Sequence, residues 1–244
     1  MHPVSPSSGF PLSPNQRRLW SLQREGAVYN ALVVLRLSGR LEPTRLQAAL
    51  GEVWGRHDGL SSCFVQRSEL RFPLQARALG PTPDVQVLAA VAGSLEASGA
   101  ELVRRGLEHR FDLASGPLLY AARMALSDTE HLLLLARPSL SGDAQAQVRL
   151  AEELLAAYAG RASEEEPGLE HAQYAEWQNQ LLAEPEPAAA EHWARALAQV
   201  KPLTLPFERT RREAPFLPAR VEVRFAGERR LPRAEEHTSE LQSR

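Results

Sequence analysis

Histidine, cysteine, serine and aspartate side chains could carry acid–base, nucleophilic or metal chemistry in this 244-residue chain. Cys63 is the only cysteine, which excludes an intrachain disulfide and thiolate zinc sites of the CxxC type. Five histidines show no spacing typical of a metal site, and we expect them on the solvated surface: His2, His109, His171, His192 and His237. The residues therefore indicate no metal and no cofactor bound by the chain itself.

A polar loop at residues 137–144 follows the apolar run at 131–135. Ser139 in this loop carries a hydroxyl, which cannot act as a base without an activating partner, and no Gly-x-Ser-x-Gly turn surrounds it. His131 lies eight residues upstream, about 26 Å along an extended strand, whereas a base must come within about 3 Å of its proton. Asp143 is a candidate general base.

The composition is typical of a globular protein, with 43% hydrophobic and 24% charged residues. The formal net charge is −2, and the three glutamates at 164–166 form the longest single-sign block, which argues against a nucleic-acid partner. No run of eighteen apolar residues occurs, and no apolar segment follows a basic one at the N-terminus. We therefore expect no membrane partner and a cytoplasmic location.

Apolar periodicity predicts a strand followed by a helix near the N-terminus. Residues 30–37 form a Val/Leu-rich run that ends at a Ser-Gly pair, which is the pattern of a buried strand and a turn. Residues 44–56 carry apolar side chains at spacings of three and four, which predicts an amphipathic helix. Its apolar face would consist of Leu46, Ala49, Leu50, Val53 and Trp54. Two short strands are expected at 60–65 and 70–76.

The middle of the chain predicts a helix and a hairpin. Ser98 with Glu101 three residues later is a capping-box pattern, so we expect a helix to begin there. Two apolar runs at 117–126 and 130–136, separated by a short polar turn, predict an antiparallel hairpin. The second run lacks alternation, which indicates a strand buried on both faces.

Three more helices are predicted after the hairpin. Residues 145–159 hold apolar side chains at helical spacing, and Gly160 is a natural cap for the end of that helix. The apolar positions are Val148, Leu150, Leu154, Leu155 and Tyr158. Further helices are expected around 174–182 and 188–199, followed by a strand-like stretch at 221–225.

These patterns divide the chain into five parts. Residues 1–9 are expected to be disordered, and residues 10–160 form the main N-terminal lobe. The acidic segment 161–169 contains Pro and Gly and is the best linker candidate. Residues 170–235 hold the last two helices and the strand-like stretch. Residues 236–244 resemble the in-frame translation of a sequencing adaptor, so we expect this tail to be non-native.

Four short motifs, in order along the chain, resemble those of nonribosomal peptide synthetase condensation domains. The first, at residues 13–22, is similar to Ser-x-Ala-Gln-x-Arg-Leu-Trp-x-Leu and departs from it only at Asn15. Its matching positions include Gln16, Arg18 and Trp20. Taken alone, such a string could equally be the packing face of a helix with its Trp in a core.

The second motif, from Arg56 to Phe64, is similar to Arg-His-Glu-x-Leu-Arg-Thr-x-Phe. His57 matches the family, and we favour a packing or hydrogen-bonding role for it. Ser61 stands where the family carries its second Arg, so a cation is missing. Residues 111–118 and 174–178 are the other two signatures, and four ordered motifs are more specific than any one of them.

The resemblance covers residues 10–226 and implies an α/β fold, an α+β two-layer sandwich like a lobe of chloramphenicol acetyltransferase. In that fold two lobes form a V with an active-site tunnel between them. This chain would hold the first lobe, the crossing helices and only the start of the second lobe. About half of the family's domain would then be absent.

The family's catalytic motif, His-His-x-x-x-Asp-Gly, falls on residues 138–144. In the family the second His lies where an aminoacyl amine attacks a carrier-bound thioester, and an imidazole with a pKa near 6.5 can take the amine proton. Here Pro138 and Ser139 replace the two His, and Ala144 replaces the Gly. Only Asp143 is retained, and because the family's Asp is thought to hold the loop through a salt bridge, we favour structural support for it.

Three functions remain open. A condensation-type domain that no longer forms peptide bonds could serve as a docking or scaffold element, with carrier domains, an adenylation domain and a recruited tailoring enzyme as partners. Alternatively, an active acyltransferase could condense a carrier-bound acyl thioester with an amine through positioning alone, which can contribute several kcal/mol. The third hypothesis is a truncated fragment without independent function. In every case phosphopantetheine would arrive on the partner carrier domain.

Overall fold

The computed structural model describes residues 9–23, 29–77, 80–91, 94–161, 169–184, 186–198 and 200–201. Most of the predicted linker, the strand-like stretch at 221–225 and the tail at 236–244 lie outside these residues. The division of the chain into five parts therefore stays a prediction. None of the helices in the described ranges is both long and apolar enough to cross a membrane.

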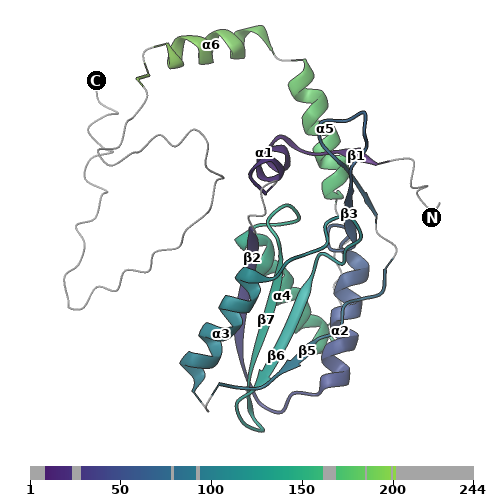
Figure 1. Ribbon diagram of the computed structural model, residues 1–244, viewed down its shortest axis with the longest axis vertical. Coiled ribbons are helices and arrows are strands. Elements are labelled where there is room, and N and C mark those ends of the chain that lie inside the picture. The colour runs from purple at the N-terminus through teal and green to yellow at the C-terminus, as the bar shows by residue number, and fades with distance from the viewer. Residues whose placement is uncertain are drawn as a thin grey trace.

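A four-stranded mixed sheet lies at the centre of the described chain, in the order β2-β7-β6-β5 (Figure 1). The strands are β2 (Asn30–Ser38), β7 (Glu130–Pro138), β6 (Tyr120–Ala125) and β5 (Gln86–Leu88). β7 pairs antiparallel with both β2 and β6, whereas β5 runs parallel to β6. The predicted first strand and hairpin are confirmed. The sequence did not predict β5, because three largely exposed residues give no readable alternation.

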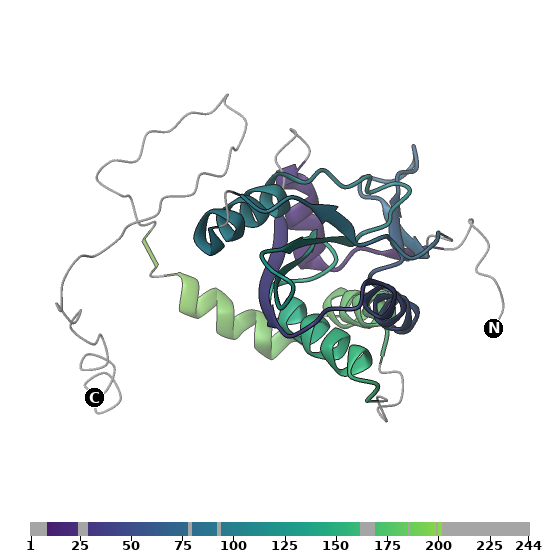
Figure 2. The same ribbon diagram turned by 90° about the horizontal axis from the view of Figure 1, so that it is seen from below.

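β7 is buried along both of its faces, as predicted from its unbroken apolar run. Leu133 and Leu135 pack with α2 (Pro43–Arg56) and α4 (Ala144–Tyr158) on one face. Leu132 and Leu134 pack with α3 (Leu95–Glu108) on the other. Helices thus lie on opposite sides of the sheet (Figure 2), and the predicted mixed α/β class is confirmed.

Two helices on one face of the sheet follow their predicted patterns closely. The five buried residues of α2 are Leu46, Ala49, Leu50, Val53 and Trp54, the face that the spacing predicted. α4 buries Leu150, Ala151 and Leu154, but Val148 is 51% exposed, so its assignment to the apolar stripe was wrong. Gly160 adopts a φ of 70° just beyond α4, the left-handed conformation that a glycine cap provides.

α3 begins earlier than predicted. Ser94 is its N-cap, and the Ser94 hydroxyl accepts a hydrogen bond from the backbone N–H of Ala97 at 3.2 Å. Ser98 is fully buried within the helix, and its hydroxyl accepts from the N–H of Val91 at 2.9 Å. The capping-box prediction at Ser98 is therefore wrong, because Ser94 supplies the cap about one turn earlier.

A second, smaller sheet lies beyond the end of β7. It contains β1 (Phe10–Pro11), β4 (Leu74–Arg77) and β3 (Ser62–Val65), all antiparallel. The two short strands predicted at 60–65 and 70–76 do pair, over shorter lengths. An apolar cluster joins this sheet to the end of the central sheet; its buried members are Leu12, Phe64, Leu118 and Leu140.

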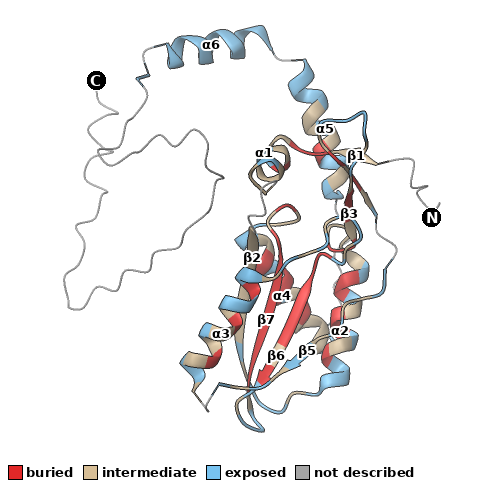
Figure 3. Ribbon diagram, viewed as in Figure 1, coloured by how far each residue is buried: buried red, intermediate tan, exposed pale blue. Residues whose placement is uncertain are grey.

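The last two described helices differ in how far they are buried (Figure 3). α5 (His171–Ala183) packs against β1 and buries Ala175 completely. α6 (Pro187–Leu197) has no buried residue, and its Trp193 is 61% exposed. The predicted helices around 174–182 and 188–199 are thus confirmed, and α6 extends away from the rest of the described chain (Figure 1).

Candidate functional site

The candidate loop continues the strand pairing of β7 for one residue and then turns. Pro138 lies opposite Asn30 in β2, and the N–H of Ser139 donates to the carbonyl oxygen of Tyr29 at 2.7 Å. The N–H and hydroxyl of Ser141 both donate to the Pro138 carbonyl, at 2.9 and 3.0 Å. Pro138 is tolerated here because the Pro138–Asn30 pair alternates with the hydrogen-bonded position at Ser139, so the ladder with β2 needs no N–H from it.

Gln16 joins the first helix, α1 (Pro14–Gln23), to this loop. Its N–H donates to the Ser13 hydroxyl at 3.2 Å and its Oε1 accepts from the Ser13 N–H at 2.9 Å, which is a capping box. Its Nε2 donates to the carbonyl oxygen of Leu140 at 3.0 Å and to Oε1 of Gln75 at 3.2 Å. The Gln of the first motif therefore supports both the start of α1 and the candidate loop.

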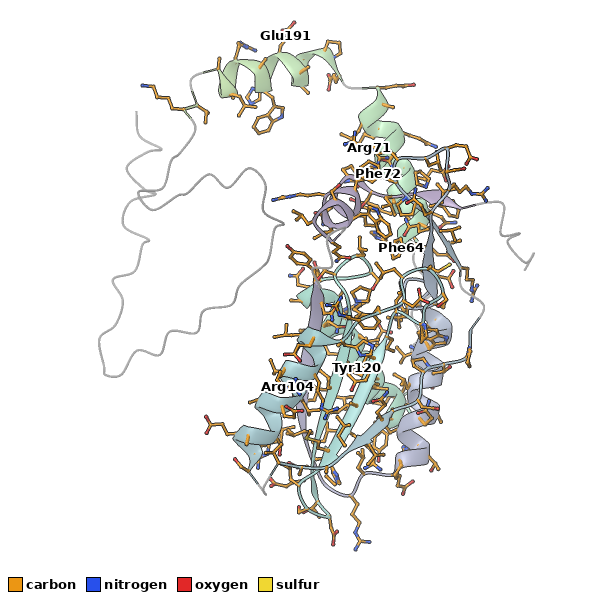
Figure 4. All side chains as sticks on the ribbon, viewed as in Figure 1. Phe64, Arg71, Phe72, Arg104, Tyr120 and Glu191 are labelled. Atoms are coloured by element: carbon orange, nitrogen blue, oxygen red, sulfur yellow. The ribbon has the colours of Figure 1, made fainter. Side chains whose placement is uncertain are left out.

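The other two positions of the first motif have different surroundings. Trp20 is half-buried, and its ring centroid lies 6.2 Å from that of Phe64. Figure 4 shows Phe64 and Phe72 in this region, beside α5. Arg18 is exposed, whereas Arg17 donates to Oδ1 of Asn179 in α5 at 2.8 Å. The motif alone could not show that the neighbouring Arg makes the contact between helices.

His57 links the second motif to α4. Its Nε2 lies 2.6 Å from Oε2 of Glu153, a hydrogen bond of the kind that the sequence favoured for this residue. Arg56 forms an ion pair with Glu52 one turn away, and its Nη1 lies 3.9 Å from the same Glu153 oxygen. Ser61 is 5% exposed, so a neutral side chain is buried where the family carries a cation.

Arg137 is the residue of the site that sequence reasoning missed. Only 7% of it is exposed, its Nε donates to Oε1 of Gln147 at 3.0 Å, and its Nη1 donates to the Ser141 carbonyl at 3.3 Å. Burial lowers the pKa of Arg137 to about 10, against the opposing charge of Asp143. The guanidinium is therefore charged at neutral pH. Gln147 is fully buried and donates in turn to the Ala31 carbonyl at 2.9 Å.

Two neighbouring residues shape the loop around this guanidinium. A Cβ on Gly142 would lie 2.6 Å from Cζ of Arg137, so only glycine fits without displacement. Asp143 caps α4, because its Oδ1 accepts from the N–H of Ala146 at 2.9 Å. Ala144 is the exposed first residue of that helix. An Asp directly before the predicted helix could have indicated the cap from sequence.

The loop brings no recognisable base to Ser139. No hydrogen bond joins the Ser139 hydroxyl to another side chain within the described ranges. His57 binds Glu153, and His131 lies at the other end of β7, opposite Leu37. In the part of the chain that the structure describes, no group of three His, Cys, Asp or Glu residues could hold a metal ion. This arrangement favours a structural role for the loop over general-base chemistry.

His109 departs from its expected place on the solvated surface. Its ring stacks on that of Tyr120 (labelled in Figure 4), with centroids 4.1 Å apart and planes 5° apart. The Phe111 ring meets it edge-on at 4.5 Å, and burial lowers the pKa of His109. Sequence reasoning missed this aromatic stack because Tyr120 is distant along the chain.

A pair of carboxyl groups connects the second motif to α5. Glu170 precedes α5, and a hydrogen bond with the Asp58 side chain raises its pKa to about 6, an effect that Arg77 partly opposes. Arg77 Nη2 lies 3.3 Å from Oδ1 of Asp58. With a pKa of about 6, Glu170 changes its protonation state in mildly acidic solution.

Comparison with known proteins gives a consistent family. A family model for the condensation domain matches residues 7–242. CymA of Salinispora arenicola, a probable non-canonical nonribosomal peptide synthetase, is 33% identical over 226 residues, which are 86% of this chain and 3% of CymA. The isonitrile lipopeptide synthase of Mycobacterium tuberculosis is 33% identical over 208 residues, 78% of this chain and 8% of that protein.

Solved structures agree with the sequence comparison. The X-domain from teicoplanin biosynthesis is 31% identical, with a TM-score of 0.69 over 86% of this chain and 48% of that one. The same domain in complex with OxyB gives a TM-score of 0.66 at the same identity and coverage. SgcC5 from Streptomyces globisporus is 25% identical, with a TM-score of 0.68 over 80% of this chain and 47% of SgcC5. The chain spans about half of these solved structures and a small part of the synthetases.

Proposed function

Because this chain belongs to the condensation-domain family, we propose that it is part of a condensation-type domain that forms no peptide bonds and docks partner proteins in a nonribosomal peptide synthetase. One observation carries the proposal. Pro138 and Ser139 stand where the sequence resemblance expects the two His of the family's motif, and within the described ranges no hydrogen bond joins the Ser139 hydroxyl to a base.

Chemistry explains why this replacement matters. An amine that attacks a thioester must lose a proton, and a positioned general base typically contributes about 10²–10⁴ in rate. Proline has no titratable group, and a hydroxyl without a partner remains protonated. Gln16 and Arg137 donate to the backbone carbonyls of Leu140 and Ser141, so these buried contacts hold the backbone of the loop in place.

The proposed partners are proteins. The X-domain that resembles this chain at 31% identity forms a complex with OxyB, which motivates docking of a tailoring enzyme here. Carrier domains and an adjacent adenylation domain are the other expected partners in the cytoplasm. A carrier domain would bring phosphopantetheine, so the chain itself needs no cofactor.

Docking can be measured with the complete parent domain. We expect its carrier domain or a tailoring enzyme encoded beside it to bind with a measurable Kd in calorimetry. The Ser139→His variant is the matched control, because it changes the catalytic position and should leave docking unaltered. Absence of binding to every one of these partners would contradict the docking role.

A second candidate, an active acyltransferase, is supported by the 33% identity to a probable non-canonical nonribosomal peptide synthetase and to an isonitrile lipopeptide synthase. Positioning alone can supply several kcal/mol towards such a reaction. Ser139→His in the parent domain distinguishes the two candidates. A large gain in rate indicates a dormant site, whereas an already active domain that does not change indicates catalysis without His.

A further inference from the structure

Ser139 follows the last residue of β7, Pro138, and comes two residues after Arg137. The Ser139 N–H donates to the Tyr29 carbonyl, so the pairing of β7 with β2 continues through this residue. Side chains two residues apart on a strand point to the same face, about 7 Å from one another. Arg137 faces α4, where Gln147 accepts its Nε–H. A side chain at position 139 therefore starts on the α4 face, next to this guanidinium.

The charge of Arg137 is not neutralised by a direct contact. Both of its hydrogen bonds go to neutral oxygens, Oε1 of Gln147 and the carbonyl of Ser141. None of the ion pairs formed between described residues includes Arg137. With 7% of the residue exposed, water screens this charge weakly.

We propose that Arg137 makes position 139 electropositive, so that the loop disfavours a protonated imidazole or an ammonium group there. This inference rests on the proposed function, and it adds a second physical reason why the domain would form no peptide bonds. In the family's reaction a proton passes from the amine nitrogen to the imidazole nitrogen, which becomes a cation. A fixed cation close to that nitrogen opposes the transfer. Restoring His at position 139 alone then restores little activity.

Asp143 offsets part of this effect, because its negative charge acts on Arg137. Asp143 is exposed and its carboxylate caps α4, and the positive end of the α4 dipole adds to the field of Arg137. Gln16 on α1 carries no charge. Asp58 precedes Gly59, which lies near the Ser141 carbonyl, and it forms an ion pair with Arg77.

Two probes at the same position separate charge from burial. Burial lowers the pKa of an imidazole and raises that of a thiol, whereas a nearby cation lowers both. We would introduce Ser139→His and Ser139→Cys separately into the 244-residue chain. The imidazole would be titrated by NMR, and the thiol by the pH dependence of iodoacetamide alkylation, read by peptide mapping so that Cys63 is resolved.

The expected result is that both pKa values fall by at least about half a unit below their ordinary values of 6.5 and 8.5. Adding Arg137→Gln should raise both back, and Arg137→Lys, which loses the fork but keeps the charge, should leave them low. Arg36→Gln on β2 removes an exposed cation and should change neither. A purely structural role of Arg137 would make the Gln and Lys variants behave alike.

A thiol pKa at or above 8.5 in Ser139→Cys overturns the inference, and so do values that Arg137→Gln leaves unchanged. If Arg137→Gln does not fold, the thiol measured beside the intact Arg137 decides the question. The proposed function is judged separately by catalysis of the parent domain. An active parent with lowered pKa values would reject that function and keep this inference.

Discussion

The side-chain amide of Gln16 donates a hydrogen bond to the carbonyl oxygen of Leu140 at 3.0 Å. This bond joins the helix of the first motif to the loop on which the family's catalytic motif is expected to fall. Leu140 is 2% exposed and lies in the apolar cluster with Phe64, so its carbonyl depends on a protein donor. The first motif thus acts on the site through structure, without contributing a reactive group.

Replacing Gln16 tests this support. Gln16→Ala leaves the Leu140 carbonyl without its donor and the Ser13 N–H without its acceptor, which should cost about 2–3 kcal/mol of unfolding free energy. The bond from the backbone N–H of Gln16 to the Ser13 hydroxyl remains. Urea denaturation followed by circular dichroism measures the loss. Gln180→Ala, at an exposed position of α5, is the matched control and should change stability by less than about 0.5 kcal/mol. If both substitutions lower the unfolding free energy equally, Gln16 does not support the loop in the way assigned to it.

Gly142 should accept a side chain only if the Arg137 guanidinium shifts. Gly142→Ala places a Cβ 2.6 Å from the guanidinium carbon, so we expect a loss of about 1–3 kcal/mol. Gly55→Ala in α2 meets no atom within 4 Å and should instead stabilise by about 0.5–1 kcal/mol. Combining Gly142→Ala with Arg137→Gln should reduce the penalty in a double-mutant cycle. An additive cycle would show that the two residues do not interact.

His131 should be replaceable with a gain in stability. It is 6% exposed, and neither ring nitrogen has a hydrogen-bond partner among the described residues. His131→Leu removes this buried polar group beside Leu37 and Ala125, and should raise the unfolding free energy by about 1 kcal/mol. Thermal unfolding at pH 7 measures it, with the exposed His192→Leu as control. A lower Tm for His131→Leu would indicate that the ring has an unrecognised partner.

The contact between Glu170 and Asp58 should weaken as the pH rises. The pKa of Glu170 is raised from 4.5 to about 6 in the folded chain, so its protonated form favours folding. This contribution is fully present below about pH 4.5 and is lost as the pH rises through about 6. Glu170→Gln imitates the protonated carboxyl, so its Tm should exceed that of the wild type above pH 6 and approach it at pH 4. A Tm difference that is constant between pH 4 and pH 7 contradicts the assignment.

Local patterns predicted much of the fold, because α2 carries a helical apolar periodicity and β7 an unbroken apolar run, and each pattern reflects the burial of its own element. The start of α3 was missed because two serines compete for the cap, and only the structure shows that Ser98 bonds Val91. At the site, the sequence pointed to Pro138 and Ser139 but not to the Arg137 guanidinium, which contacts the same loop. Gln147 on α4 and Gly142 in the turn lie against Arg137 only in the folded chain. The sequence pattern alone therefore did not indicate that Arg137 belongs to the site.

Peptide-bond formation by the complete parent domain is the most direct test of the central claim. Two carrier proteins, one loaded with an acyl donor and one with an aminoacyl acceptor, would be mixed with the domain and the dipeptidyl product followed by mass spectrometry. The account predicts a rate at least about 10²-fold below that of an ordinary condensation domain tested in parallel, because no base replaces the missing imidazole. Turnover at the ordinary rate, with Pro138 and Ser139 unchanged, would contradict it.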